Sequence, residues 1–441
     1  MFRLALASVR RSPVLFAGQF ITTALAAALI AVNGAAFTAA LTAPHAGSED
    51  MGGAITVLAF GGVVSAFVTI TGLLSATGLS VALRRRDLAL LRLIGSTSGQ
   101  SRGMILLETL TLSVLAGLVG TVLGALLSAP AITLVNQIGL APVALTATVN
   151  VFPLLIAWAA AVILSVLGAL LAAGRAAAIP PAEALRAADL DDRVMTPSRW
   201  IPGTLVGLGG IAMIVLAFLN SLEAATPLTI FGAIALAVSV AAWAPVLLPL
   251  LGRLILAPLK AVPSVGPRIA AASVITGRRR TAALAAPILA AITIIGTLSA
   301  VLHQANTATG ASAQQATLND TVLIVLTAPG LLYVLIASAS AQLMTYTSRR
   351  TELHAMRLLG ITRSSITLGS LVESLTAALL GVIAGLAITV AALLAYRQAL
   401  ARTLGHATLT LPWTTLGLIS GSCLLVLLIT GAAAAHHHAR S

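Results

Sequence analysis

The sequence predicts an all-α integral membrane protein of about ten transmembrane helices, built as two parallel four-helix repeats joined by a two-helix insert. Three observations predict this fold. Hydrophobic residues make up 59% of the 441 residues and charged residues only 8%, which excludes a water-soluble domain of this length. The apolar residues form stretches long enough to cross a bilayer. Two stretches, with the charged loops before them, repeat each other 265 residues apart.

Each apolar stretch is long enough to supply the roughly 20 residues that an α-helix needs to cross about 30 Å of hydrocarbon, and we expect the longest stretches to include turns outside the membrane. Charged and polar residues separate the stretches and define their number better than their ends. The first is too long for a cleaved signal peptide, so we expect it to remain as an anchor. The predicted spans are residues 14–41, 53–82, 104–134, 150–173, 203–221, 228–257, 282–302, 321–346, 366–395 and 413–435.

Basic residues alternate from loop to loop and predict the topology. They gather before span 1, between spans 2 and 3, 4 and 5, 6 and 7, and 8 and 9, and at the end of the chain, whereas the alternate loops hold only Arg397 and Arg402. By the positive-inside rule both termini are cytoplasmic, which requires an even number of spans. The net charge of +13 thus reflects topology and attraction to membrane lipids, and we expect no nucleic-acid partner.

The repeat divides the chain into three predicted domains. Spans 1–4 belong to residues 1–190, a linker with spans 5–6 occupies residues 191–265, and spans 7–10 belong to residues 266–441. Equivalent points are six spans apart, an even number, so the two halves share one orientation and inverted repeats are not expected. The loops on the external side are too short to fold as independent domains.

The repeated unit begins with a charged cytoplasmic segment. Residues 84–95, RRRDLALLRLIG, are matched by residues 349–360, RRTELHAMRLLG. We predict that span 2 continues into the cytoplasm as a helix with Leu88, Leu91 and Ile94 on one face, ended by a glycine that tolerates the left-handed conformation. An ordinary basic loop is the alternative to a docking element. The docking candidates are Arg85, Arg86, Leu88, Arg92, Gly95, Arg350, Glu352, Leu353, Arg357 and Gly360.

Two carboxylates and two glycine pairs follow in the repeat. Glu108 and Glu373 stand thirteen residues after the repeated glycines, which places them about one turn into spans 3 and 9. An ionisable group there is costly unless it is paired or near the interface. Pairing with a nearby arginine and a role in transmitting motion both remain open. The helix-packing candidates, expected to contact the other half through Gly-xxx-Gly spacing, are Gly120, Gly124, Gly381 and Gly385.

Catalytic constellations are missing from the sequence. The sole lysine, Lys260, is followed by Ala261, so a phosphate-binding loop of Walker type is absent. Cys423 is the only cysteine, and His436 to His438 have no carboxylate or thiol cluster beside them, which favours a solvated tail over a metal site. We therefore expect no enzymatic activity, no metal site and no cofactor in this chain.

The spacing of charges, glycine and Glu resembles the FtsX/MacB-type permease domain of ABC transporters. Residues 179–186, IPPAEALR, resemble the end of that domain, and two FtsX-like domains would cover roughly residues 55–186 and 320–435. The second copy departs from the pattern, since it ends in AHHHARS where this corner is expected. The ten-span architecture is similar to that of bacitracin-resistance-type permeases, without their large extracellular domain.

The resemblance implies a separate cytoplasmic ABC ATPase, as two copies that bind ATP and Mg²⁺ and grip residues 84–103 and 349–365 of a permease in a bacterial plasma membrane. Because the external loops are short, we expect export or membrane extraction of an amphipathic compound, such as an antimicrobial peptide or drug, and thus antimicrobial resistance. Two alternatives are a non-transporting regulator that relays ATPase motion to an envelope partner and an ion-coupled secondary carrier.

Overall fold

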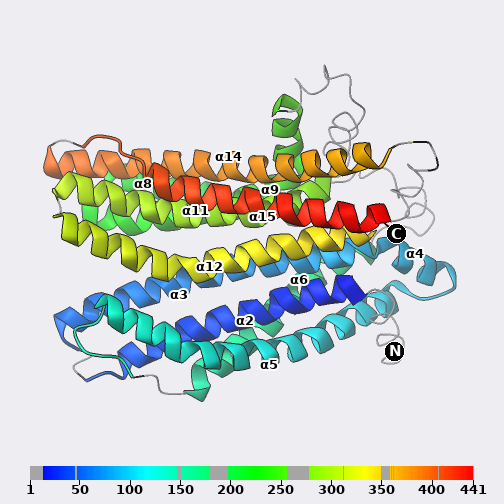
Figure 1. Ribbon diagram of the computed structural model, residues 1–441, viewed down its shortest axis with the longest axis horizontal. Helices are drawn as coiled ribbons and strands as arrows, with labels where there is room; N and C mark the ends of the chain where they lie inside the picture. Colours follow the sequence, from blue (N-terminus) through cyan, green and yellow to red (C-terminus); the bar gives the residue numbers. More distant parts are fainter. Residues whose placement is uncertain are drawn as a thin grey trace. The chain divides into compact units, whose positions relative to one another are not determined.

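The computed structural model describes residues 13–44, 47–146, 150–177, 197–255, 278–310, 312–348, 358, 360, 362–405 and 407–440. Within these residues every regular element is a helix (Figure 1). Ten of the described helices are long and apolar enough to cross a membrane. The all-α membrane fold and the ten spans predicted from the sequence are thus confirmed.

The described residues fall into two compact units. The first comprises residues from Met1–Leu190 and Thr321–Met344, and the second comprises residues from Asp191–Asp320 and Thr345–Ser441. The helices of the first unit are α2 (Pro13–Leu41), α3 (Glu49–Leu83), α4 (Arg85–Leu93), α5 (Ser98–Ile138), α6 (Val151–Ala177) and most of α12 (Ala313–Ser348). Those of the second are α8 (Pro197–Leu219), α9 (Leu222–Ile255), α11 (Arg278–Thr309), α14 (Arg363–Leu404) and α15 (Trp413–Arg440).

In the first unit α2 is the central helix. It packs against α3, α5 and α6, and Figure 1 shows α2, α3 and α5 running side by side. α12 joins these helices through glycines: an added Cβ on Gly61 would meet Leu326, and one on Gly72 would meet the ring of Tyr333. The spatial units therefore group α12 with the first repeat, whereas the sequence groups this helix with residues 266–441.

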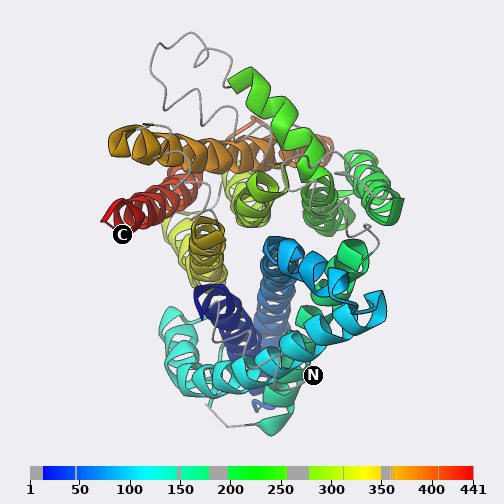
Figure 2. The ribbon, with the colours of Figure 1, turned by 90° about the vertical axis from the view of Figure 1, so that its right-hand side faces the viewer.

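In the second unit α11 has the central place that α2 has in the first. Nearly all of the apolar stretch of α11 is buried. The helix packs against α14, α9 and, less extensively, α15. Figure 2, which looks roughly along the spans, shows α11 beneath α14 and beside α9. The hairpin of α8 and α9, which has no counterpart in the first repeat, also covers part of α14.

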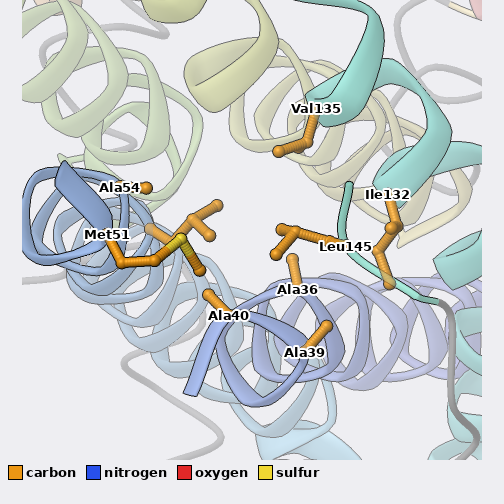
Figure 3. Packing of buried hydrophobic residues seen from close by; sticks show 9 residues of the cluster. Ala36, Ala39, Ala40, Met51, Ala54, Ile132, Val135 and Leu145 are labelled. Carbon is orange, nitrogen blue, oxygen red and sulfur yellow. The ribbon is translucent and has the colours of Figure 1, made fainter. Parts of the chain in front are cut away.

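The end of the first unit opposite α4 is closed by an apolar cluster (Figure 3). Leu145, from the connection after α5, packs among the ends of α2, α3 and α5. Asn136 holds this connection, since its side chain donates to the Leu145 carbonyl at 2.9 Å and accepts from the Leu145 amide at 2.8 Å. The other members of the cluster are Ala36, Ala39, Ala40, Met51, Ala54, Leu58, Ile132 and Val135.

In the second unit a glutamine has the role that Asn136 has in the first. Gln304, at the end of α11, donates to the Thr408 carbonyl and accepts from the Thr410 amide at 3.1 Å. The connections that follow α5 and α14 both begin with a left-handed glycine, Gly139 (φ 72°) and Gly405 (φ 78°). Both described connections are therefore tied to the helix ends rather than extended away from them.

Candidate functional site

The short helix α4 forms because the chain leaves helical geometry at Arg84 (φ −97°, ψ 7°) and resumes it at once. Leu88 anchors α4, since it is buried in a cluster with Val81 of α3, Ile105 of α5 and Ala169 of α6. The segment predicted to dock a partner is thus a separate short helix (Figure 1) rather than a continuation of α3, because the break at Arg84 ends that span.

The opposite side of α4 is also apolar but exposed. Leu90, Leu93 and Ile94 are all accessible, and Leu93 is 52% exposed. The predicted stripe of Leu88, Leu91 and Ile94 is only partly right, because α4 ends at Leu93 and leaves Ile94 beyond its last turn. Arg85 and Arg86 lie in the first turn and Arg92 in the last. An exposed apolar side between charged ends suits a partner groove better than water.

Gly95 ends α4 in the left-handed conformation, with a φ of 105°. Its amide donates to the Arg92 carbonyl and the Ser96 amide donates to the Leu91 carbonyl, the hydrogen-bond pattern of a Schellman cap. Thr97 then caps α5, because its hydroxyl accepts from the Gln100 amide while the Gln100 side chain accepts from the Thr97 amide. The turn between α4 and α5 is thus fixed by the left-handed Gly95 and by the capping box of Thr97 and Gln100.

The second copy repeats the part of this geometry that the structure describes. Gly360 is left-handed, with a φ of 84°, and Thr362 caps α14 by accepting from the Ser365 amide. Leu358, the equivalent of Leu93, is 78% exposed. Four candidates lie outside the described residues: Arg350, Glu352, Leu353 and Arg357.

A buried ion pair links α4 to the spans. The Arg84 guanidinium donates to both carboxylate oxygens of Glu108, one of them at 3.3 Å. The side chain of Glu108 is only 1% exposed and that of Arg84 13%. The guanidinium carbon also lies 5.0 Å from the ring centroid of Phe16. One residue at the junction of α3 and α4 therefore contacts α5 and α2.

Glu108 lies deeper in its helix than the sequence suggested. α5 begins at Ser98, well before the apolar stretch, so Glu108 is ten residues in, almost three turns rather than one. Glu373 has the same place in α14, ten residues after Arg363, and is also buried. The equivalent of Arg84, Arg349, lies outside the described residues. A helix N-terminus does not explain these carboxylates, because its field fades within the first turn.

The candidate glycines lie where two helices approach closely within each unit. An added Cβ on Gly120 would collide with the carbonyl oxygen of Ala24, and one on Gly124 would lie 2.6 Å from the Cβ of Ala31. Both partners belong to α2. The expectation that these glycines face the other half is therefore wrong for the first repeat, where span 3 packs on span 1 of the same unit.

The second repeat reproduces this contact at the same spacing. An added Cβ on Gly385 would lie 3.1 Å from the Leu289 carbonyl oxygen, and one on Gly381 would lie 2.8 Å from the Ala285 carbonyl oxygen. Both partners belong to α11. Leu289 and Gly385 stand 265 residues after Ala24 and Gly120. The structural repeat thus extends to spans 1 and 7, whose sequences show no clear match.

The sequence interpretation missed Arg84, Phe16, Leu90 and Leu93. A signal for Arg84 was present, because Arg84 and Arg349 open the two copies. The sequence alone does not show which of the three neighbouring arginines pairs with Glu108. No group of His, Cys, Asp and Glu that could hold a metal ion occurs among the described residues. Cys423 is buried in α15, and the side chains of His436 to His438 lie outside the description.

Comparison with known proteins agrees with the repeat. No match was found among curated proteins. The family model described as FtsX-like permease C-terminal matches residues 59–181 and 321–440, together more than half of the chain. The two matched segments contain α4 with its buried ion pair and the second copy of the same element. The chain therefore belongs to the FtsX-like permease family, the non-catalytic membrane subunits of ABC systems.

Proposed function

We propose that this chain is the transmembrane permease of an ATP-driven transporter, moved by a separate ATPase dimer to export an amphipathic compound or extract it from the membrane. The duplicated element carries the proposal: each copy exposes a leucine, Leu93 or Leu358, just before a left-handed glycine. Two equivalent surfaces in one chain suit two copies of one partner. ATP and Mg²⁺ would be held by that partner.

Burial of the exposed leucines would supply the affinity for the ATPase, and the neighbouring arginines would set the orientation in which it binds. Exposed leucines on a short helix fill an apolar groove in the helix-in-groove mode. Arginines beside them pair with carboxylates at the groove rim and steer association. The basic residues that flank the element also favour the cytoplasmic side for this end of the spans, with both termini on that side.

The Arg84–Glu108 pair would transmit the docking motion to the spans. α4 is joined to α3 through Arg84, whose side chain contacts Glu108 of α5 and Phe16 of α2. A displacement of α4 must therefore move three spans or break a buried ion pair, which costs about 3–5 kcal/mol. Glu373 would have the same role in the second repeat, because it is buried at the equivalent place in α14.

The cargo proposal depends on the opposite end of the molecule. The connections after α5 and α14 are short and tied down by Asn136 and Gln304, which leaves little structure to grip a large external protein. A compound already partitioned into the bilayer needs no such domain. The alternative of a regulator for an envelope partner would require that partner to bind within the membrane.

Association and transport can be tested together. The charge reversals Arg85→Glu and Arg350→Glu are expected to weaken co-purification of the ATPase and to reduce transport in liposomes. The control is Arg253→Glu, which reverses an exposed charge on α9 outside the repeated element. Unchanged association of the double variant would refute the docking assignment.

A second measurement separates the functional alternatives. ATPase activity that rises with peptide or lipophilic drug, in liposomes without any envelope protein, supports transport and counts against a regulator. Movement of the compound driven by an ion gradient without ATP would instead establish a secondary carrier.

A further inference from the structure

The two repeats differ on one helix face. In the second unit the hairpin of α8 and α9 covers a strip along α14, where Ile388 and Ala392 pack with Ala233 and Ala237 of α9. Leu380 packs at one end of this strip against Ala244 and Leu248. The covered residues of α14, each at most 8% exposed, are Leu380, Ile388, Ala392, Ala395 and Ala399.

The equivalent strip of α5 is open. α5 and α14 have the same orientation in their units, since Gly120 meets Ala24 and Gly385 meets Leu289 at one common spacing. Counted from the helix starts, Leu380, Ile388, Ala392 and Ala399 of α14 correspond to four leucines of α5. These leucines are between 41% and 54% exposed: Leu115, Leu123, Leu127 and Leu134.

Side-chain size distinguishes the two strips. Where α9 approaches closely, α14 carries alanine at positions 392, 395 and 399, because small residues let helix backbones come together in lipid. At positions 127 and 134 α5 carries leucine instead. A leucine there would hold a second helix away, but it suits disordered acyl chains.

The length and chemistry of the open strip also fit a bilayer. Leu115 and Leu134 are 19 residues apart, roughly 28 Å along a helix and close to the hydrocarbon thickness of about 30 Å. The exposed large side chains between them on α5 are all aliphatic: Leu118, Val119, Val122, Leu123, Leu126 and Leu127. No charged side chain lies on this stretch, and its exposed polar side chain, Thr133, donates its hydroxyl to the Ala129 carbonyl of the same helix at 2.9 Å.

We infer that the α5 strip is a contact surface for lipid acyl chains across the whole hydrocarbon layer, and that spans 5 and 6 replace lipid on the equivalent strip of α14. The two repeats then differ in what covers this strip. Lipid contacts it on α5 of the first repeat, and the helices α8 and α9 cover it on α14 of the second. This inference depends on packing alone and stands whether or not the chain docks an ATPase.

Photolabelling of the full-length chain tests the inference directly. The chain is reconstituted in phosphatidylethanolamine and phosphatidylglycerol vesicles that contain phosphatidylcholine with a diazirine in its acyl chain, and labelled residues are mapped by mass spectrometry. We expect label on residues 115–134 and none on Ala392, Ala395 or Ala399. Absence of label on α5, or equal labelling of the two strips, would overturn the inference. The mapping is then repeated in native membranes. Protection of residues 115–134 from label there would show that another protein covers the strip, and would also overturn the inference.

A pair of matched substitutions adds a second test. Leu127→Ala removes a lipid-facing side chain and is expected to leave the folded yield unchanged. Ala392→Leu puts the larger side chain at the equivalent position of α14, where it must displace α9, so it is expected to lower the yield or to admit label to α14. Equal effects of the two substitutions would show that both strips have the same surroundings.

Discussion

Arg84 and Glu108 are joined by two hydrogen bonds at the junction where α3 passes into α4. The carboxylate is buried and the guanidinium nearly so. Both charges have lost most of their contact with water, so each is stabilised mainly by the opposite charge of its partner. Arg84 also lies over the ring of Phe16. This pair is the candidate link between α4 and the spans.

The substitution Arg84→Leu is expected to destabilise the protein strongly. It leaves the Glu108 carboxylate buried without its partner, which costs about 3–5 kcal/mol. The reversed pair, Arg84→Glu with Glu108→Arg, should recover part of this loss because opposite charges face each other again. Thermal unfolding in detergent micelles measures both effects.

The matched control for this prediction is Arg102→Leu. Arg102 is an exposed arginine near the same end of α5, and its side chain donates to the Gly174 carbonyl at 3.4 Å. An exposed interaction of this kind contributes little to stability, so the midpoint of thermal unfolding should hardly change. If Arg84→Leu were as stable as Arg102→Leu, the ion pair would have no structural role.

Gly120→Ala is expected to lower stability although alanine favours helices. The new Cβ would collide with the Ala24 carbonyl oxygen, and overpacking of this kind costs about 1–3 kcal/mol. Gly78→Ala is the control, because a Cβ on Gly78 of α3 meets no atom within 4 Å and gains up to about 1 kcal/mol of helix propensity. Folded yield and midpoint should fall for the first variant only. Equal tolerance would show that α2 and α5 are not in close contact.

The sequence was sufficient for the features that depend on local chemistry. Apolar length predicts the spans, because hydrocarbon thickness sets the length of a crossing helix. Gly95 and Gly360 were expected to end helices and both are left-handed, since only glycine adopts this conformation without cost. The repeated charges placed one copy of the charged element in each half, and the docking role of this element stays a prediction.

Features that depend on which helix meets which could not be predicted. In lipid an apolar face carries no hydrophobic drive towards another helix, so hydropathy did not show that α12 packs in the first unit or that Gly120 faces α2. The partner of Glu108 was equally open, because Arg84, Arg85 and Arg86 follow one another. In the structure Arg84 lies at the break between α3 and α4, and its side chain contacts Glu108 of α5.

The exposed leucines of the repeated element give a prediction about the partner. Leu93→Asp and Leu358→Asp are each expected to weaken ATPase binding, because a carboxylate placed in an apolar groove loses its hydration. The double variant should lose binding far more severely, since two linked sites support each other through effective concentration. Affinity is measured by titration of the purified ATPase against the permease in nanodiscs.

Leu409→Asp is the control for this prediction. Leu409 is similarly exposed but lies in the connection after α14, at the opposite end of the spans. Its substitution should leave ATPase affinity unchanged. Equal loss of binding in Leu409→Asp would point to misfolding rather than to a docking surface.

Asn136→Ala is expected to release the connection that follows α5. The substitution removes both hydrogen bonds to Leu145 and leaves a buried carbonyl and amide without partners, at about 1–3 kcal/mol in total. Local opening should then become more frequent, and hydrogen exchange of residues 139–146 should accelerate while that of α2 stays slow. Asn220→Ala, which removes only an exposed bond to the Leu216 carbonyl, should leave exchange unchanged. Exchange in the Asn136→Ala variant as slow as in the wild type would show that Leu145 alone holds the connection, through its apolar burial.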